Sequence, residues 1–369
     1  MKAVIHQNLN LSLLLYQRIE ELLPDNFEML RITDDKTAFS VYHAHKLYMS
    51  GEIEKILLPS DRTRTGILGE IEYLVDLGWK KEDILIASID LMRGKKNIQF
   101  ATAFMSADEF CYMTTLLVPV TEHCNLNCKG CSHFSPLLNE KKFLDFGRWS
   151  KDLQRLKELV PHIQNMNFLG GEPLLHEHLD EFITFARSIY PYTHFQIVTN
   201  GILLPLVPSK LLDAIKKTST SIYLSVYPDM VPKITEWIEF LQSEEISYTL
   251  VNAAHFTPML LDSREEFPLD TTEFICSNCP MMMDGILARC PMCLTVHYFN
   301  EAFDKNYPYK DSLIDIYNKQ LTSKKLFQEL NEVHELCCYC SRYKMGGVKT
   351  NKWENYRVGE ERKEKDWIL

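Results

Sequence analysis

Three cysteines, Cys124, Cys128 and Cys131, are spaced C-x3-C-x2-C in the segment EHCNLNCKGCSHF. Three thiolates on one loop can bind three irons of a [4Fe–4S] cube, because thiolate is the ligand that such clusters prefer. The fourth iron then has no protein ligand and stays open to a small molecule. A zinc ion would need a fourth ligand, which His123 or His133 could supply, so a zinc site is the alternative.

Three further short motifs lie at the ends of predicted strands downstream of these cysteines: Gly170-Gly171-Glu172-Pro173, Thr199-Asn200-Gly201 and Ser225. In this order the chain resembles the radical SAM superfamily, whose signature is the same cysteine spacing on the loop after the first barrel strand. The resemblance covers residues 116–252. It implies that Cys124, Cys128 and Cys131 hold the cluster, and that S-adenosylmethionine (SAM) is bound by Gly170, Gly171, Glu172, Pro173, Thr199, Asn200 and Ser225.

The resemblance also implies how these cofactors are used. The amino and carboxylate groups of SAM chelate the open iron, and the Glu172 carboxylate pairs with the ammonium group. An electron from the reduced cluster breaks a carbon–sulfur bond, and the resulting 5′-deoxyadenosyl radical removes a hydrogen from the substrate. A flavodoxin or ferredoxin is the implied electron donor. Gly130 departs from the family pattern, in which an aromatic residue before the third cysteine helps to recognise adenine through its backbone; Phe134 is the candidate to supply the missing surface.

Seven more cysteines follow residue 275, as two C-x2-C pairs and one C-C-x-C group. Gly285 precedes Cys290 by five residues, which resembles the G-x4-C step of SPASM and twitch extensions. Those extensions follow radical SAM barrels and carry auxiliary iron–sulfur clusters, so the resemblance implies one auxiliary [4Fe–4S] cluster. Paired C-x2-C knuckles are also typical of zinc ribbons, which keeps structural zinc as the alternative. The candidate ligands are Cys276, Cys279, Cys290, Cys293, Cys337 and Cys340.

Alternating strands and helices must position the first cysteine group. Apolar spacing predicts helices at 147–160, 178–189, 210–217 and 233–244. It predicts strands at 115–122, 165–171, 194–201, 221–228 and 247–252. This alternation indicates parallel strands with right-handed crossovers, and hence a partial (β/α)6 TIM-like barrel. Such folds carry their chemistry at the C-terminal strand ends, where the motifs lie.

The remaining chain divides into three predicted regions around a barrel at residues 113–262. Residues 1–112 predict a small Rossmann-like α/β domain, with strands at 1–6, 27–32, 55–60 and 83–88 and helices at 13–23 and 66–79. Within it, residues 54–88 resemble modules of polysaccharide-biosynthesis proteins. The motif G-x-G-x-x-G is missing, so a docking or packing role is favoured over dinucleotide binding. Residues 263–348 predict a cysteine-rich, twitch-like extension with a helix over 311–337. Residues 349–369 are polar and predict a solvated tail or surface segment.

Composition excludes several classes of function. The net charge of −10 over 369 residues argues against general nucleic-acid binding. The sequence has no run of 18 apolar residues, so no membrane span is predicted. The N-terminal segment MKAVIHQNLNLSLLLYQ lacks a signal-peptide pattern, so a cytoplasmic location is expected. Cytosolic thiols stay reduced, and grouped cysteines there more often bind metal than form disulfides.

Three functions follow as hypotheses. The first is a radical SAM enzyme of oxidoreductase or epimerase type, which epimerises, oxidises or deoxygenates a carbohydrate or small metabolite. The second is a radical SAM maturase of a ribosomally made peptide. The third, from another class, is a non-enzymatic zinc or electron-transfer module, which would not need the Gly-Gly-Glu-Pro motif.

Overall fold

A computed structural model of the chain describes residues 2–5, 28–30, 41–58, 64–87, 104–107, 112–191, 193–265, 279–341 and 350–369. The chain divides into two compact units, Met1–Thr114 and Thr115–Leu369. Cys276 and the helix predicted over 13–23 lie outside the described residues. None of the helices described is long and apolar enough to cross a bilayer.

The first unit is a small α/β sheet. Its strand order is β2-β1-β3-β4-β5, and every pair is parallel except β4–β5. Its core is formed by residues such as Ile56, Leu74 and Trp79. The elements are β1 (Lys2–Ile5), β2 (Glu28–Leu30), α2 (Val41–Met49), β3 (Lys55–Leu58), α3 (Arg64–Asp76), β4 (Ile84–Ala87) and β5 (Phe104–Ser106).

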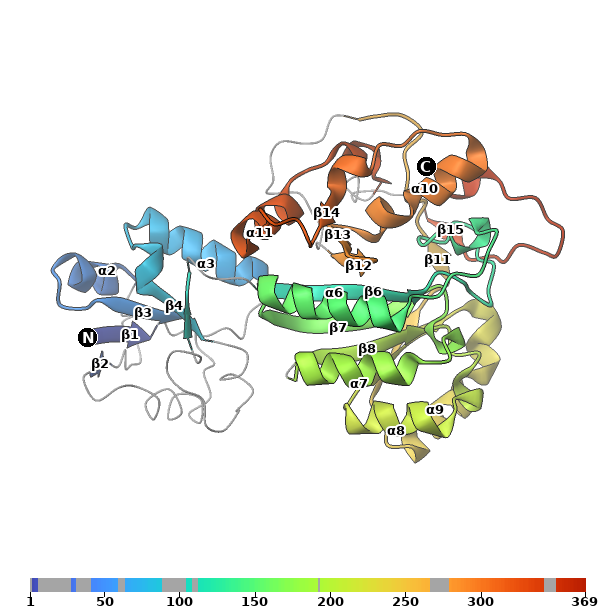
Figure 1. Cartoon of the computed structure of the whole chain (residues 1–369), viewed down its shortest axis with the longest axis horizontal. Helices are drawn as coiled ribbons and strands as arrows, with labels where there is room; N and C mark the ends of the chain where they lie inside the picture. The colour runs from blue at the N-terminus through green and yellow to red at the C-terminus, as the bar shows by residue number, and fades with distance from the viewer. Residues whose placement is uncertain are drawn as a thin grey trace. The chain divides into compact units, whose positions relative to one another are not determined.

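The second unit is built on five parallel strands that alternate with four helices. The strand order β10-β9-β8-β7-β6 follows the chain without a jump. Right-handed crossovers then place α6–α9 on one face of the sheet, as Figure 1 shows. The elements are β6 (Tyr112–Thr121), α6 (Phe146–Leu159), β7 (His162–Gly170), α7 (Leu179–Ile189), β8 (His194–Thr199), α8 (Ser209–Lys217), β9 (Ser221–Val226), α9 (Ile234–Ser243) and β10 (Tyr248–Asn252).

Aromatic side chains fill the space between these helices and strands. Trp149 of α6 lies 4.7 Å from Phe182 of α7 and 6.3 Å from Phe168 of β7, measured between ring centroids. Asp145 caps α6, since its carboxylate accepts a 2.7 Å hydrogen bond from the Arg148 N–H. The expected α/β class with a parallel sheet is confirmed. In the described part of the chain the sheet stays open and does not close into a barrel.

The C-terminal extension continues the same sheet beyond β6. Met281 of β12 pairs in parallel with Leu117 of β6, and β13 and β14 add antiparallel strands. The elements are β11 (His255–Phe256), β12 (Met281–Met283), β13 (Ile286–Ala288), α10 (Pro291–Phe303), β14 (Leu313–Asp315), α11 (Ser323–Asn331) and β15 (Asn351–Lys352).

The helix predicted over 311–337 is wrong in its first half. Residues 313–315 form β14, and the Ile316 N–H donates to the Gly285 carbonyl at 3.1 Å. The helix begins only after Thr322, whose hydroxyl accepts from the Lys325 N–H and caps α11. The buried residues Ile314 and Ile316 alternate with the exposed Asp315, as a short strand beside β13 requires, and this pairing overrides the local helical pattern.

Candidate functional site

The three cysteines of the first group lie on the loop that follows β6, and their side chains line one cavity of about 210 Å³. We call residues 122–134 the cysteine loop. The cavity is also lined by residues from the C-terminal ends of β7, β8 and β9, as expected for a parallel α/β site. The predicted site residues that line it are Cys124, Cys128, Cys131, Gly170, Gly171, Thr199, Asn200 and Ser225.

The three thiols line one cavity, as the ligands of one iron–sulfur cube must. Among the described residues, no three His, Cys, Asp or Glu side chains are grouped as ligands of one metal ion. Thiolates of a cube each bind a different iron, so they share one cavity without converging on one point. Burial raises the pKa of Cys124, of Cys131 and of Cys128, the last to about 12. A metal must therefore displace protons from these thiols as it binds. His133 lines the same cavity and remains the candidate fourth ligand of the zinc alternative.

Two glycines bring β7 into close contact with the cysteine loop. A Cβ atom on Gly170 would lie 1.8 Å from the Thr121 carbonyl oxygen, and one on Gly171 would lie 2.1 Å from the His123 carbonyl oxygen. The Gly171 N–H donates to the Thr121 oxygen at 2.7 Å, and the Glu172 N–H donates to the His123 oxygen at 2.9 Å. Only glycine allows this approach at both positions.

The Glu172 carboxylate is not among the groups that line the cavity, and its pairing with the ammonium group of SAM stays a prediction. The residue is 0% exposed and accepts hydrogen bonds from the Thr199 hydroxyl at 2.6 Å, the Asn200 N–H at 2.9 Å and the Leu174 N–H at 3.1 Å. Burial raises the pKa of Glu172 to about 7. The side chain instead joins the ends of β7 and β8. Pro173 is also buried and begins a short 3₁₀ turn away from the cavity lining.

Asn200 connects β8 to the cysteine loop. Its amide nitrogen donates to the Asn125 side-chain oxygen at 2.7 Å, and its amide oxygen accepts from the Ile202 N–H at 3.0 Å. The same nitrogen lies 3.9 Å from Cys124 Sγ. Asn200 therefore supports the loop that carries the cysteines as well as lining the cavity.

Residues 350–369 form a strap along the cysteine loop, drawn in red in Figure 1. We call them the C-terminal strap. The Lys129 N–H donates to the Glu354 carbonyl and the Tyr356 N–H to the Asn127 carbonyl, both at 2.8 Å. Trp367 is 0% exposed, and its indole N–H donates to the Cys131 carbonyl at 2.9 Å. In the segment expected to be a solvated tail or surface segment, Trp353, Tyr356 and Trp367 are buried, while the other residues are exposed or half-buried.

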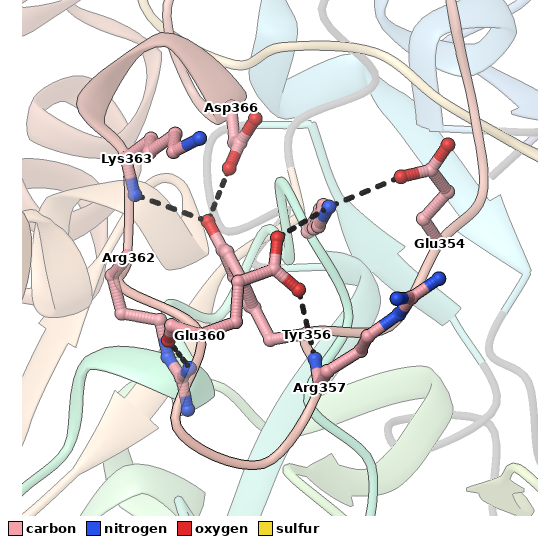
Figure 2. Close-up of polar contacts among 8 residues, drawn as sticks. Glu354, Tyr356, Arg357, Glu360, Arg362, Lys363 and Asp366 are labelled. Atoms are coloured by element: carbon pink, nitrogen blue, oxygen red, sulfur yellow. Dashed lines mark hydrogen bonds and ion pairs between the residues drawn. The ribbon is translucent and has the colours of Figure 1, made fainter.

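Polar side chains stabilise the conformation of the C-terminal strap, and Figure 2 shows their contacts. The Tyr356 hydroxyl donates to the Asp366 carboxylate and accepts from the Lys363 N–H at 3.4 Å. Glu360 accepts from the Arg357 N–H at 2.9 Å, and Lys129 of the cysteine loop lies 2.8 Å from the Glu360 carboxylate. The strap is therefore a defined part of the site.

The strap also explains the glycine at position 130. Gly130 has a φ of +70°, and a Cβ atom there would lie 2.6 Å from the Asp366 carbonyl oxygen. An aromatic side chain at this position would collide with the strap. Phe134, the candidate to replace that aromatic surface, is 0% exposed in the core between the loop and α10, and it does not line the cavity.

Four cysteines of the C-terminal extension lie near one another. Cys290 precedes α10, and the Cys293 N–H donates to its carbonyl at 3.1 Å. A hydrogen bond from the Cys290 side chain lowers the pKa of Cys293. Cys337 is close enough to Cys290, Cys293 and Cys340 for mutual electrostatic effects, while burial raises its pKa to about 11. Cys279 packs against the same hydrophobic core as Cys290, Cys293 and Cys340.

Comparison with known proteins finds a family match for part of the second unit. Residues 118–241 match the Radical SAM superfamily. A 7,8-dihydro-6-hydroxymethylpterin dimethyltransferase of Methanocaldococcus jannaschii is 36% identical over 96 residues, which are 25% of this chain and 18% of the relative. A GTP 3′,8-cyclase of a Sulfurovum species is 31% identical over 126 residues, 33% of this chain and 37% of the relative.

Among solved structures, BtrN in complex with AdoMet and 2-DOIA has a TM-score of 0.42 and 16% identity, covering 62% of this chain and 93% of that chain. The chain spans well under half the length of the two curated relatives above. The sequence likeness to these relatives, like the family match, is confined to part of the chain. On the family match and the cysteine loop within it, residues 118–241 are a radical SAM domain.

Proposed function

We propose that the chain is a radical SAM enzyme that cleaves SAM reductively and removes a hydrogen atom from an organic substrate. The observation that carries this proposal is the shared cavity at the ends of β6, β7, β8 and β9. Three thiols, two glycines and the polar residues Thr199, Asn200 and Ser225 meet there, as the two cofactors require.

The residues divide into cluster ligands and a SAM subsite. Cys124, Cys128 and Cys131 would hold three irons and leave the fourth open for the amino and carboxylate groups of SAM. When bound, the cluster supplies the electron that cleaves SAM to methionine and the 5′-deoxyadenosyl radical. Gly170 and Gly171 present backbone at the cavity, so their carbonyl oxygens are the candidates to accept from the SAM ammonium. Ser225 is the candidate contact for the ribose or carboxylate.

The proposed substrate is a carbohydrate or small metabolite, which the enzyme would epimerise, oxidise or deoxygenate. The support is the likeness of residues 54–88 to modules of polysaccharide-biosynthesis proteins. A ribosomally made peptide is the second candidate substrate. Incubation with SAM and either sugar nucleotides or a peptide library, with mass spectrometry of both, distinguishes the two by which compound loses or exchanges hydrogen.

We propose a second [4Fe–4S] cluster of twitch type in the C-terminal extension. The proximity of Cys290, Cys293, Cys337 and Cys340 supports this set, with Cys279 and Cys276 as further candidates. A flavodoxin or ferredoxin in the cytoplasm is the proposed electron source. The reducing cytosol would also keep the thiols available for metal.

The decisive test is anaerobic reconstitution with iron and sulfide, followed by dithionite and SAM. We expect 5′-deoxyadenosine and methionine in equal amounts, and none from a protein in which all three cysteines of the loop are alanine. A protein that binds stoichiometric zinc and leaves SAM intact would support the zinc or electron-transfer module instead.

A further inference from the structure

We propose that Trp353 of the C-terminal strap is a positioning residue that raises the reduction potential of the cluster, by donating its indole N–H to the sulfur of Cys128. This inference rests on the proposed function, because it requires a cluster on the cysteine loop. It assigns a redox role to a segment that belongs to neither the cysteine motif nor the residues predicted to bind SAM.

The contact is a hydrogen bond to a ligand sulfur. Trp353 Nε1 lies 3.2 Å from Cys128 Sγ, and both residues are buried, at 7% and 6% exposed. An indole N–H is a donor only, so its direction is unambiguous. Because the bond is buried, water does not compete for the donor.

The indole is held in this orientation from two sides. The backbone N–H of Trp353 donates to the Ala254 carbonyl at 2.9 Å, next to the pairing of β15 with β11. Its ring lies 5.2 Å from the Tyr227 ring, at an interplanar angle of 33°. The ring also packs with Leu126 and Cys128 of the cysteine loop. These contacts fix the donor independently of any ligand in the cavity.

A donor aimed at sulfur changes the balance between the two redox states. One-electron reduction adds negative charge to the cluster, and part of that charge is on the ligand sulfurs. A hydrogen bond to sulfur therefore stabilises the reduced state more than the oxidised state, and it raises the potential. Removal of the donor should make the cluster harder to reduce.

The test compares Trp353→Phe with the reconstituted wild-type protein in a redox titration followed by electron paramagnetic resonance. Phenylalanine keeps one aromatic ring and removes the N–H together with the second ring of the indole, a loss of volume that the Trp367→Phe control shares. We expect the ratio of reduced to oxidised cluster at a fixed potential to fall by about tenfold, which for a one-electron couple is a midpoint shift of about 59 mV to more negative values. An unchanged midpoint in a variant that holds its full iron content would overturn the inference.

Trp367→Phe is the matched control, because it removes an indole N–H from the same strap. That N–H ends on the Cys131 carbonyl and not on a sulfur. Its removal should shift the midpoint much less, and equal shifts in the two variants would show that loosening of the strap, and not the sulfur contact, is responsible.

A second measurement needs no variant. In the reduced wild-type protein labelled at the indole nitrogen of tryptophan, electron-nuclear double resonance should detect that nitrogen and its exchangeable proton coupled to the cluster. A missing coupling contradicts the inference even if Trp353→Phe fails to fold. If the wild-type protein assembles no cluster that cleaves SAM, the proposed function fails first. If it cleaves SAM and shows neither the shift nor the coupling, only the role of Trp353 fails.

Discussion

The hydroxyl of Thr199 donates a 2.6 Å hydrogen bond to the buried carboxyl group of Glu172. Through this bond the end of β8 is joined to the end of β7, and the Asn200 N–H donates to the second carboxyl oxygen at 2.9 Å. Asn200 in turn reaches the cysteine loop through Asn125. The buried carboxyl group of Glu172 thus ties two strand ends together.

The buried Glu172 should make stability fall as pH rises from about 4.5 to about 7. Its pKa is about 7 in the folded chain, against an ordinary value of 4.5. In this window the folded state keeps the proton that the unfolded state has lost, so deprotonation favours unfolding. The loss is at most about 3 kcal/mol across the window. Urea denaturation of the metal-free protein as a function of pH measures it.

Glu172→Gln should remove this component of the pH dependence, whatever its effect on overall stability. The exposed Glu177, five residues along the chain, is the matched control. Glu177→Gln should leave the slope of the wild-type protein in place. If Glu172→Gln kept the full slope, the carboxyl group would not be the titrating group.

Cys128→Ala should lower cluster content and SAM cleavage by more than about 100-fold, because one iron of the cube loses its only protein ligand. Iron and sulfide analysis and the yield of 5′-deoxyadenosine check this. Cys338→Ala is the control, since Cys338 is also buried but is not among the candidate ligands. A variant at Cys128 that kept a SAM-cleaving cluster would contradict the assignment.

Gly171→Ala should destabilise the second unit by at least about 3 kcal/mol, since the new methyl group overlaps the His123 carbonyl oxygen and the backbone of the loop must move. Thermal unfolding and iron incorporation are the measurements. Gly69→Ala in α3 meets no atom within 4 Å, and a helical position favours alanine over glycine by about 0.5–1 kcal/mol. That control should leave unfolding of the second unit unchanged; equal losses in both would argue against the close approach at Gly171.

Replacement of Cys290 and Cys293 together by alanine should halve the iron content and leave the SAM-binding cluster in place. The two residues belong to the proposed second cluster, whose ligands are separate from the cysteine loop. Mössbauer spectra of the wild-type and double-variant proteins count the clusters. Unchanged iron in the double variant would exclude a cluster at this position.

The order of the parallel strands could be predicted because each strand is a short apolar run that ends in an unusual motif. Gly170, Thr199 and Ser225 follow or end such runs, and parallel strands bring their C-terminal ends to one edge. The direction of the Glu172 side chain could not be predicted in the same way. The Gly-Gly-Glu-Pro motif fixes the position of Glu172 at the end of β7. The hydrogen bonds from Thr199 and Asn200 decide that the Glu172 side chain points into the protein.

The C-terminal strap could not be predicted because its sequence signal is sparse. Trp353, Tyr356 and Trp367 are separated by charged residues at no regular interval, so the segment has neither helical nor strand periodicity. The hydrogen bonds that tie its tryptophans to the cysteine loop join residues more than 200 positions apart. The one hint was Gly130, whose departure from the family pattern indicated that something else fills the space beside the third cysteine.

The sequence separation of Trp353 from Cys128 has a consequence for how the protein is made. The two residues are 225 positions apart. At usual rates of translation the ribosome needs on the order of ten seconds or more to add that length of chain. During synthesis the cysteines are therefore exposed well before their cover exists. In this interval all three thiols are open to an iron–sulfur carrier, whereas in the finished protein the indole of Trp353 lies against the sulfur of Cys128.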